Sequence, residues 1–363
     1  MTFISSSHIA LICAGLLLSA GAVAQTPPQP LPMPAEIAAP RDVPYIGVLR
    51  LDVDATDTAR HIFNVRETIP VAGGTRTTLL YPRWLPGSHS PSACVEALAG
   101  LIIRAGGARL EWTRDVVDVY AFHVDVPASV TSLDVEFQFL SAVDSDQGRI
   151  VMTQEMMNLQ WASMALYPAG YFTRQFPVVA SVKMPEGWRL AGGLETASTS
   201  GDVTTFKQTT FEELVDSPLF AGKHFKTIDL GMAGTAPVRL NIVADRPELL
   251  ETKPEHEKAH KDMVIQAMKL FGSHHFDHYD FRLALTNRMG GIGLEHHQSS
   301  ENSLSPTAFT EWDKNADERD LLPHELVHSW NGKFRRPADL WTPTFNVPMR
   351  DSLLWVYEGQ TQY

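Results

Sequence analysis

The chain has 363 residues and a formal net charge of −12 at pH 7. The acidic balance argues against a nucleic-acid-binding surface, which requires clustered Lys and Arg, and the length suits about two domains. Of its two cysteines, Cys13 lies in a segment expected to be removed and Cys94 remains alone, so no internal disulfide is expected.

An apolar run near the N-terminus, residues 9–18, is followed by the small residues AVA at 22–24. This order is typical of an export signal, and the run is too short to span a membrane. Residues 1–24 are therefore interpreted as a signal peptide, with an apolar anchor that stays attached as the alternative. The Pro-rich segment 25–44 is expected to be an extended leader. The mature protein is expected to be periplasmic or secreted, without stable membrane insertion.

Residues 45–244 show mostly a period of two. The segment SLDVEFQFL, residues 132–140, alternates apolar and polar side chains, which is the pattern of a strand with one buried face. Similar runs recur at residues 118–126 and 176–184, and Gly and Pro turns separate such runs. Several short strands with turn signals predict an antiparallel β-sandwich domain over residues 45–244.

The periodicity becomes helical after residue 245. Residues 255–272 place Met263, Ala267, Leu270 and Phe271 on one stripe and end at Gly272, which predicts a helix. A strand is expected at residues 281–286. Two further helices are expected, one capped by Asp320 and one that begins near Asp351. The chain is therefore expected to be an α+β multidomain protein, with a second domain over residues 245–363.

The segment LLPHELVHSWNGKF, residues 321–334, holds two histidines four residues apart. On a helix these residues lie on one face, so His324 and His328 can both offer a ring nitrogen to one ion. Glu325 lies beside the first histidine and can take a proton from water. The spacing H-E-x-x-H is typical of a zinc site with a glutamate base, although two helical histidines without a metal are the plain alternative.

A catalytic zinc with two histidine ligands requires a third protein ligand and one open position. Glu358 follows in the apolar segment WVYEG, where an unpaired carboxylate would be costly to bury. We expect Glu358 to be the third ligand of one Zn²⁺ per chain, against the alternative of a solvated face of an amphipathic helix.

The segment GGIGLEHHQSS, residues 290–300, combines glycines with an extended pattern. Gly290, Gly291 and Gly293 would let a substrate backbone approach closely, and an extended edge can pair with a peptide. Glu295 would then bind the free ammonium group of that peptide. The alternative is a hairpin turn with a surface glutamate. Of the next two residues, both histidines, at most one should face the site, because neighbours on a strand point to opposite faces.

Together these motifs resemble the M61 glycyl aminopeptidases, zinc exopeptidases of the gluzincin group. The resemblance rests on HELVHSWNGKFRRPADLW, WVYEGQTQY and GGIGLEHHQSS, and is supported by RWLPGSHSP and ELVDSPLFAG in the β region. It spans nearly all of residues 45–363. It implies a β-sandwich packed on a thermolysin-like catalytic domain, and a preference for N-terminal glycine or alanine.

The resemblance also implies roles for individual residues. His324, His328 and Glu358 would hold zinc, Glu325 would be the general base and then the proton donor, and Glu295 would bind the substrate's α-amine. The family continues past this point, so the catalytic domain is expected to be incomplete, with an oxyanion-stabilising tyrosine expected beyond Tyr363. A zinc endopeptidase on the same site and a non-catalytic exported peptide-binding fragment are the alternatives to a zinc aminopeptidase.

Overall fold

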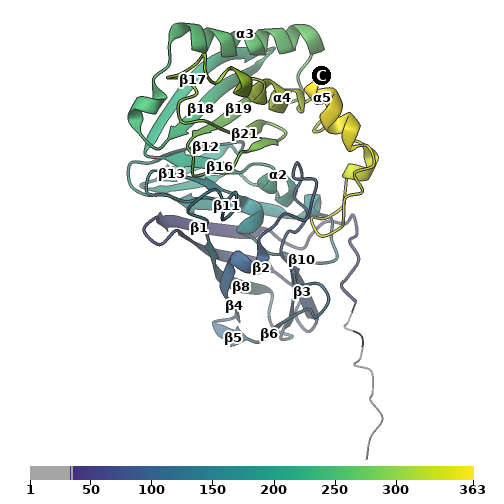
Figure 1. Ribbon diagram of the computed structural model, residues 1–363. Coiled ribbons are helices and arrows are strands. Elements are labelled where there is room, and N and C mark those ends of the chain that lie inside the picture. The colour runs from purple at the N-terminus through teal and green to yellow at the C-terminus, as the bar shows by residue number, and fades with distance from the viewer. Residues whose placement is uncertain (1–32, 34–35) are drawn as a thin grey trace, which may run out of the picture. The chain divides into compact units, whose positions relative to one another are not determined.

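In the computed structural model, which describes residues 33 and 36–363, the segments with a period of two form strands (Figure 1). The expected signal peptide and most of the expected leader lie outside the described residues. The predicted strand at residues 132–140 is observed as β8 (Ser132–Leu140), with Leu133, Val135, Phe137 and Phe139 all buried. Residues 37–363 form one compact unit.

The largest sheet contains nine strands in the described residues, and its neighbours are antiparallel except for the parallel pair β1 and β11. Along the sheet these strands are β13 (Thr196–Ser200), β14 (Val203–Phe206), β11 (Pro177–Lys183), β1 (Leu49–Asp57), β2 (Ile62–Pro70), β8, β4 (Leu98–Ala105) and β5 (Ala108–Leu110), with β15 (Thr209–Thr210) paired to β11.

Two smaller sheets complete the N-terminal β region, which we define as residues 49–222. One holds β10 (Tyr167–Pro168), β3 (Arg76–Leu80), β7 (Ala121–Asp125) and β6 (Trp112–Arg114), and the other holds β12 (Arg189–Gly192), β16 (Leu219–Gly222) and β9 (Met156–Leu159). The short helices in and after this region are η1 (Val95–Ala97), η2 (Trp161–Ser163), η3 (Thr173–Gln175), α2 (Phe211–Val215), η4 (Pro247–Leu250), η5 (Ala316–Glu318) and η6 (Ala338–Leu340).

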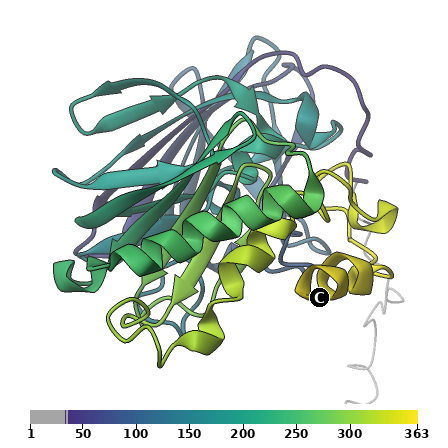
Figure 2. The same ribbon diagram turned by 90° about the horizontal axis from the view of Figure 1, so that it is seen from above.

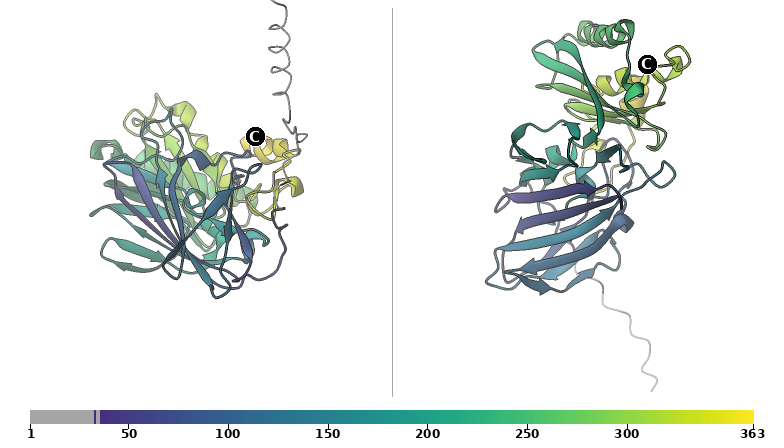
Figure 3. Two further views of the ribbon diagram at one scale, coloured as in Figure 1. Left: turned by 90° about the horizontal axis from the view of Figure 1, so that it is seen from below. Right: turned by 90° about the vertical axis from the view of Figure 1, so that its left-hand side faces the viewer.

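The C-terminal region, residues 224–363, is built on a five-stranded mixed sheet. Its order is β17 (His224–Ala233), β18 (Ala236–Ala244), β19 (Tyr279–Leu285), β21 (Ser299–Leu304) and β20 (Gly293–Glu295). Figure 3 shows this sheet, in green, beyond the large sheet of the N-terminal β region. β20 therefore lies at the edge of the five-stranded sheet, as the extended pattern around Glu295 predicted.

The hydrophobic cores divide the chain earlier than the expected boundary at residue 244. The first core extends from Leu49 to Ala221, joined by Phe345, whereas the second begins at Ile228. β17 and β18 carry the same two-residue period as the preceding strands, so the sequence pattern alone grouped them with the first domain. A third cluster, which includes Ile292 and Leu294, packs β20 against the N-terminal β region.

Helix α3 (Pro254–Phe271) packs against β17 and ends at Gly272, whose φ of 68° is the left-handed cap expected from the sequence (Figure 2). One predicted member of its buried stripe is wrong, because Leu270 is 75% exposed. Val264 is buried instead. No helix among the described residues is both long and apolar enough to cross a membrane.

Two short helical segments carry the predicted metal ligands. Helix α4 covers Leu321–Val327 with Asp320 at its N-cap position, as expected, but the Asp320 carboxylate accepts a hydrogen bond from the Gln362 amide rather than from the helix backbone. The final helical segment begins at Leu354 rather than near Asp351, whose φ of 55° is left-handed. It consists of a π-helical turn, η7 (Trp355–Gly359), and α5 (Gln360–Gln362), and α5 lies beside α4 (Figure 1).

Candidate active site

The two histidines of H-E-x-x-H lie one helical turn apart, with His328 at the C-cap of α4. Their Nε2 atoms are 3.1 Å apart. The Nδ1 atom of His328 lies 3.0 Å from the carbonyl oxygen of Asn331, which can only accept a hydrogen bond. Nδ1 therefore carries the hydrogen in the neutral ring, and the lone pair on Nε2 points toward His324.

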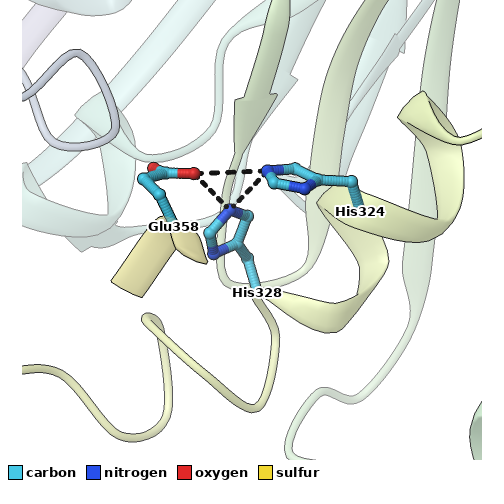
Figure 4. Close-up of side chains that lie close together, drawn as sticks. All are labelled: His324, His328 and Glu358. Atoms are coloured by element: carbon cyan, nitrogen blue, oxygen red, sulfur yellow. Dashed lines mark hydrogen bonds and ion pairs between the residues drawn. The ribbon is translucent and has the colours of Figure 1, made fainter. Parts of the chain in front are cut away.

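The η7 turn brings Glu358 to the same point. Its Oε2 atom lies 3.2 Å from Nε2 of His324 and 3.3 Å from Nε2 of His328 (Figure 4). Three donors at about 2.0 Å from a tetrahedral zinc would be separated by about 3.3 Å. The three donor atoms therefore have the separations of one face of a zinc tetrahedron, and the two nitrogens and one oxygen fit the ion.

The charges at this cluster favour an ionised Glu358. Burial opposes ionisation, but the rings of His324, His328 and His89 against the carboxylate hold the pKa of Glu358 far below its usual range. A cation between the three donors would take over the stabilisation that His324 and His328 give to the carboxylate.

Glu325 lies on the next face of α4 and is almost completely buried. Burial, with the negative charges of Glu295 and Glu358, raises its pKa well above the ordinary value. Its Oε2 atom has no hydrogen-bond partner within the described part of the chain. A carboxylate with a raised pKa and a free oxygen is suited to accept a proton near neutral pH.

Glu295 ends the edge strand β20 and is 2% exposed. Its carboxylate, Glu325 and His328 form a second group whose donor atoms all lie within 4.8 Å of one another. Burial opposes ionisation of Glu295, but the charge of Lys333, the neighbouring His328 ring and a hydrogen bond from Tyr357 hold its pKa below the ordinary value. The pKa values of the two neighbouring glutamates are thus shifted in opposite directions: that of Glu295 is lowered, which favours the anion, and that of Glu325 is raised, which favours uptake of a proton.

The three predicted substrate-binding glycines differ in their surroundings. A β-carbon built at Gly293 would clash with Oε1 of Glu325, and one at Gly291 would meet nothing within 4 Å. One at Gly290 would only touch the carbonyl oxygen of Ser145, at 3.6 Å. Of the three positions, only 293 therefore requires glycine, because a side chain there would displace the Glu325 carboxylate.

His296 and His297 lie between β20 and β21 and differ in burial. His296 is buried, with Nδ1 3.2 Å from Asp216 and Nε2 3.2 Å from Glu301. His297 is exposed, and its backbone N–H donates to Asp216. Neither belongs to a group of metal donors among the described residues.

Several residues near the site were not predicted from the sequence. His89 contacts Glu358, Tyr357 contacts Glu295, and Asp216 forms an ion pair with Lys333, with Nζ–Oδ1 2.8 Å. His89 and Asp216 stand in RWLPGSHSP and ELVDSPLFAG, segments noted for their resemblance to a family but without an assigned role. Their position in those segments was the only signal available.

Two sequence profiles match the chain. The profile described as Peptidase M61 N-terminal domain matches residues 50–223, and the profile described as M61 glycyl aminopeptidase matches residues 317–363. No curated protein matches the chain significantly.

A solved structure shares the fold. The aminopeptidase N family protein from Idiomarina loihiensis superposes with a TM-score of 0.72 at 21% identity, over 86% of this chain and 53% of that protein. This chain therefore spans about half the length of that protein.

Two further structures superpose less closely on the chain. An M1 zinc metallopeptidase from Deinococcus radiodurans has a TM-score of 0.46 at 14% identity, over 80% of this chain and 64% of that one. Leukotriene A4 hydrolase from Saccharomyces cerevisiae has a TM-score of 0.48 at 13% identity, over 78% of this chain and 44% of that one.

The fold is the α+β arrangement that the sequence predicted, with an N-terminal β domain before a short helical part. The two matched segments together make up more than half of the sequence. The chain belongs to the M61 peptidase family.

Proposed function

We propose that the chain carries the metal centre of a zinc-dependent aminopeptidase that removes small N-terminal residues, glycine or alanine, from peptides. The observation that carries the proposal is the convergence of His324, His328 and Glu358 on one point, with separations that fit zinc. Membership of a peptidase family supports the reaction class. The preference for glycine or alanine rests on the family resemblance alone.

Zinc in such a site supplies a Lewis acid that activates water near neutral pH and polarises a carbonyl oxygen. The chain's own residues do the rest. Glu325, buried and with a raised pKa, accepts a proton from the attacking water and passes it to the leaving amine. Water adds across the peptide bond: its hydroxyl group stays on the released amino acid, and its other hydrogen goes to the amine of the remaining peptide.

Glu295 gives the site its exopeptidase character in this proposal. It is the buried carboxylate whose pKa is lowered, so it remains an anion that can pair with a substrate ammonium group. The edge strand β20 would lie along the substrate backbone. A zinc endopeptidase would need no such anion, so N-acetyl-glycine p-nitroanilide should be a much poorer substrate than glycine p-nitroanilide.

The first test measures metal content and hydrolysis in the purified chain and in His324→Ala. We expect about one zinc per chain in the wild type and loss of the metal in the variant. Hydrolysis of glycine p-nitroanilide should disappear with the metal. A folded wild-type chain that takes up no zinc would contradict the proposal. Peptide binding without zinc or hydrolysis would favour a non-catalytic peptide-binding fragment.

We further propose that the protein is exported, on the strength of residues 1–24. The test is the N-terminal sequence of the protein recovered from periplasm or medium after expression in a bacterium. A recovered protein whose N-terminal residue is Gln25 would support the proposal. A protein that stays in the cytoplasm and still begins at Met1 would contradict it.

A further inference from the structure

One loop of the N-terminal β region reaches the metal donors of the C-terminal region. The loop lies between Arg83 and Ser90, and a β-bridge joins Leu85 to Ser90 across it. A β-carbon built at Gly87, whose φ is 78°, would fall within 2.9 Å of both carboxylate oxygens of Glu295. Two residues further, His89 contacts Glu358, 269 residues away in the sequence.

The two oxygens of Glu358 face different partners. Oε2 faces the histidine pair, at 3.2 Å from His324 and 3.3 Å from His328. Oε1 lies 2.7 Å from Nε2 of His89. His89 does not belong to either group of metal donors found among the described residues, so it contacts the donor carboxylate without joining the donor set.

His89 is held firmly in this position. Its side chain is 15% exposed, and its ring lies edge-on to the Tyr357 ring, with the centroids 4.9 Å apart. The backbone has a φ of 48°, an uncommon conformation for a residue other than glycine. Because a carboxylate only accepts hydrogen bonds, Nε2 carries the hydrogen and donates it to Oε1.

A carboxylate can bind a metal through one oxygen or through both. If Glu358 bound zinc through both oxygens, the second oxygen would occupy the position that a catalytic zinc keeps open. The hydrogen bond from His89 engages Oε1 and directs only Oε2 toward the two histidines. It also fixes the rotation of the carboxyl group, which otherwise turns about a soft torsion.

We propose that His89 is a positioning residue that holds Glu358 as a one-oxygen donor and thereby makes the N-terminal β region part of the metal centre. This inference rests on the proposed zinc site. Hydrogen-bonding partners of metal ligands typically contribute 10- to 100-fold to metal affinity or activity. The effect on zinc binding can be measured without any turnover.

The test compares zinc affinity in four forms of the full chain by competition with a chelator. His89→Asn removes the bond and keeps a residue that tolerates the left-handed backbone. His89→Gln retains an N–H donor at the position of Nε2. The matched control is His61→Asn, because His61 also has a left-handed φ, of 58°, and its ring lies 2.6 Å from the carbonyl oxygen of Met152, away from the metal donors.

We expect His89→Asn to bind zinc about 10- to 100-fold more weakly than the wild type, and His89→Gln and His61→Asn to stay within about threefold of it. The visible absorption of the Co²⁺-loaded protein gives a second readout, since it weakens as the coordination number rises. It should weaken in His89→Asn only. Thermal unfolding of each metal-free form confirms that the variants are folded.

Equal zinc affinity and an equal cobalt spectrum in the wild type and His89→Asn would overturn the inference. The inference would also be overturned if His89→Gln lost as much zinc affinity as His89→Asn, because the hydrogen bond would then not be the cause. A wild-type chain that binds no zinc would instead overturn the proposed function.

Discussion

The hydroxyl group of Tyr357 donates a hydrogen bond to Oε1 of Glu295, joining the last helical segment to the edge strand β20. Tyr357 precedes Glu358 in the chain, so neighbouring residues serve the two sides of the site. Glu358 faces the histidine pair, and Tyr357 supports the carboxylate proposed to bind the substrate's ammonium group. Any shift of the η7 turn would therefore disturb the proposed metal ligand and the proposed amine-binding carboxylate together.

Replacing Tyr357 with Phe should weaken substrate binding more than catalysis. A hydrogen bond to a charged group contributes about 1.5–3 kcal/mol, so the KM for glycine p-nitroanilide should rise about tenfold or more. Zinc content should stay the same, because the ring remains against His328. Tyr81→Phe is the matched control, since its buried hydroxyl donates to the carbonyl of Ser163 in the β region. An unchanged KM in Tyr357→Phe would refute the role.

Replacing Glu325 with Gln should leave zinc bound and remove turnover. Glutamine keeps the shape of the side chain but cannot accept and release the proton, which typically contributes 10²- to 10⁴-fold. The measurement is kcat together with zinc stoichiometry in the same preparation. Activity close to that of the wild type, with zinc present, would exclude Glu325 as the base.

Substitution of Gly293 by Ala should reduce activity without unfolding the protein. The new β-carbon would clash with the carboxylate of Glu325, the movable end of a side chain, so the base is displaced while the backbone stays in place. Gly291→Ala is the control in the same segment, because nothing lies within 4 Å of its added carbon. We expect kcat to fall by about 10²-fold or more in the first variant only. Equal activity in both variants would contradict the prediction.

Asp216 and Lys333 form a buried pair whose halves come from the two regions of the chain. The Lys333 side chain is 2% exposed and that of Asp216 18%, and the lysine Nζ lies 2.8 Å from the carboxylate. Asp216→Asn removes the charge that compensates the lysine and should lower the free energy of unfolding by about 3–5 kcal/mol. The double variant with Lys333→Met should lose less than the two single variants added together. If the loss of unfolding free energy in the double variant, measured by urea unfolding, equalled the sum of the two single losses, the two residues would not be coupled.

Glu67 should make the protein less stable as the pH rises. It points into the core from β2, and burial raises its pKa from 4.5 to about 8, opposed only by a hydrogen bond from the backbone of Leu166. The folded state therefore holds a proton that the unfolded chain has released. This stabilisation is complete below pH 4.5 and is lost as the pH rises through 8.

Between pH 6 and pH 8 the free energy of unfolding should fall by at most about 2 kcal/mol because of this one group. Glu67→Gln binds no proton in either state and should lack that slope. Urea unfolding of both proteins at the two pH values measures it. Parallel pH dependence in the wild type and the variant would contradict the raised pKa of Glu67.

Several features of the fold follow directly from local sequence. The two-residue period at residues 132–140 specifies a strand with one buried face, and β8 has the predicted bounds. Gly272 ends α3 because glycine adopts the left-handed cap without strain. Helix α4 begins directly after Asp320, as predicted, although the Asp320 side chain bonds to Gln362 rather than to the helix. The last helical segment begins at Leu354 rather than near Asp351, whose left-handed backbone forms a turn.

The sequence by itself indicated the residues that we propose as metal ligands. Spacing of four on a helix places His324 and His328 on one face, and a carboxylate in an apolar segment points to Glu358. Only the tertiary structure decided what surrounds them. The contact of His89 with Glu358 joins residues 269 positions apart, and the pairing of Tyr357 with Glu295 depends on how β20 packs beside the last helical segment. Helical and strand periods report which face of an element is buried, but not which loop of another region will lie against it.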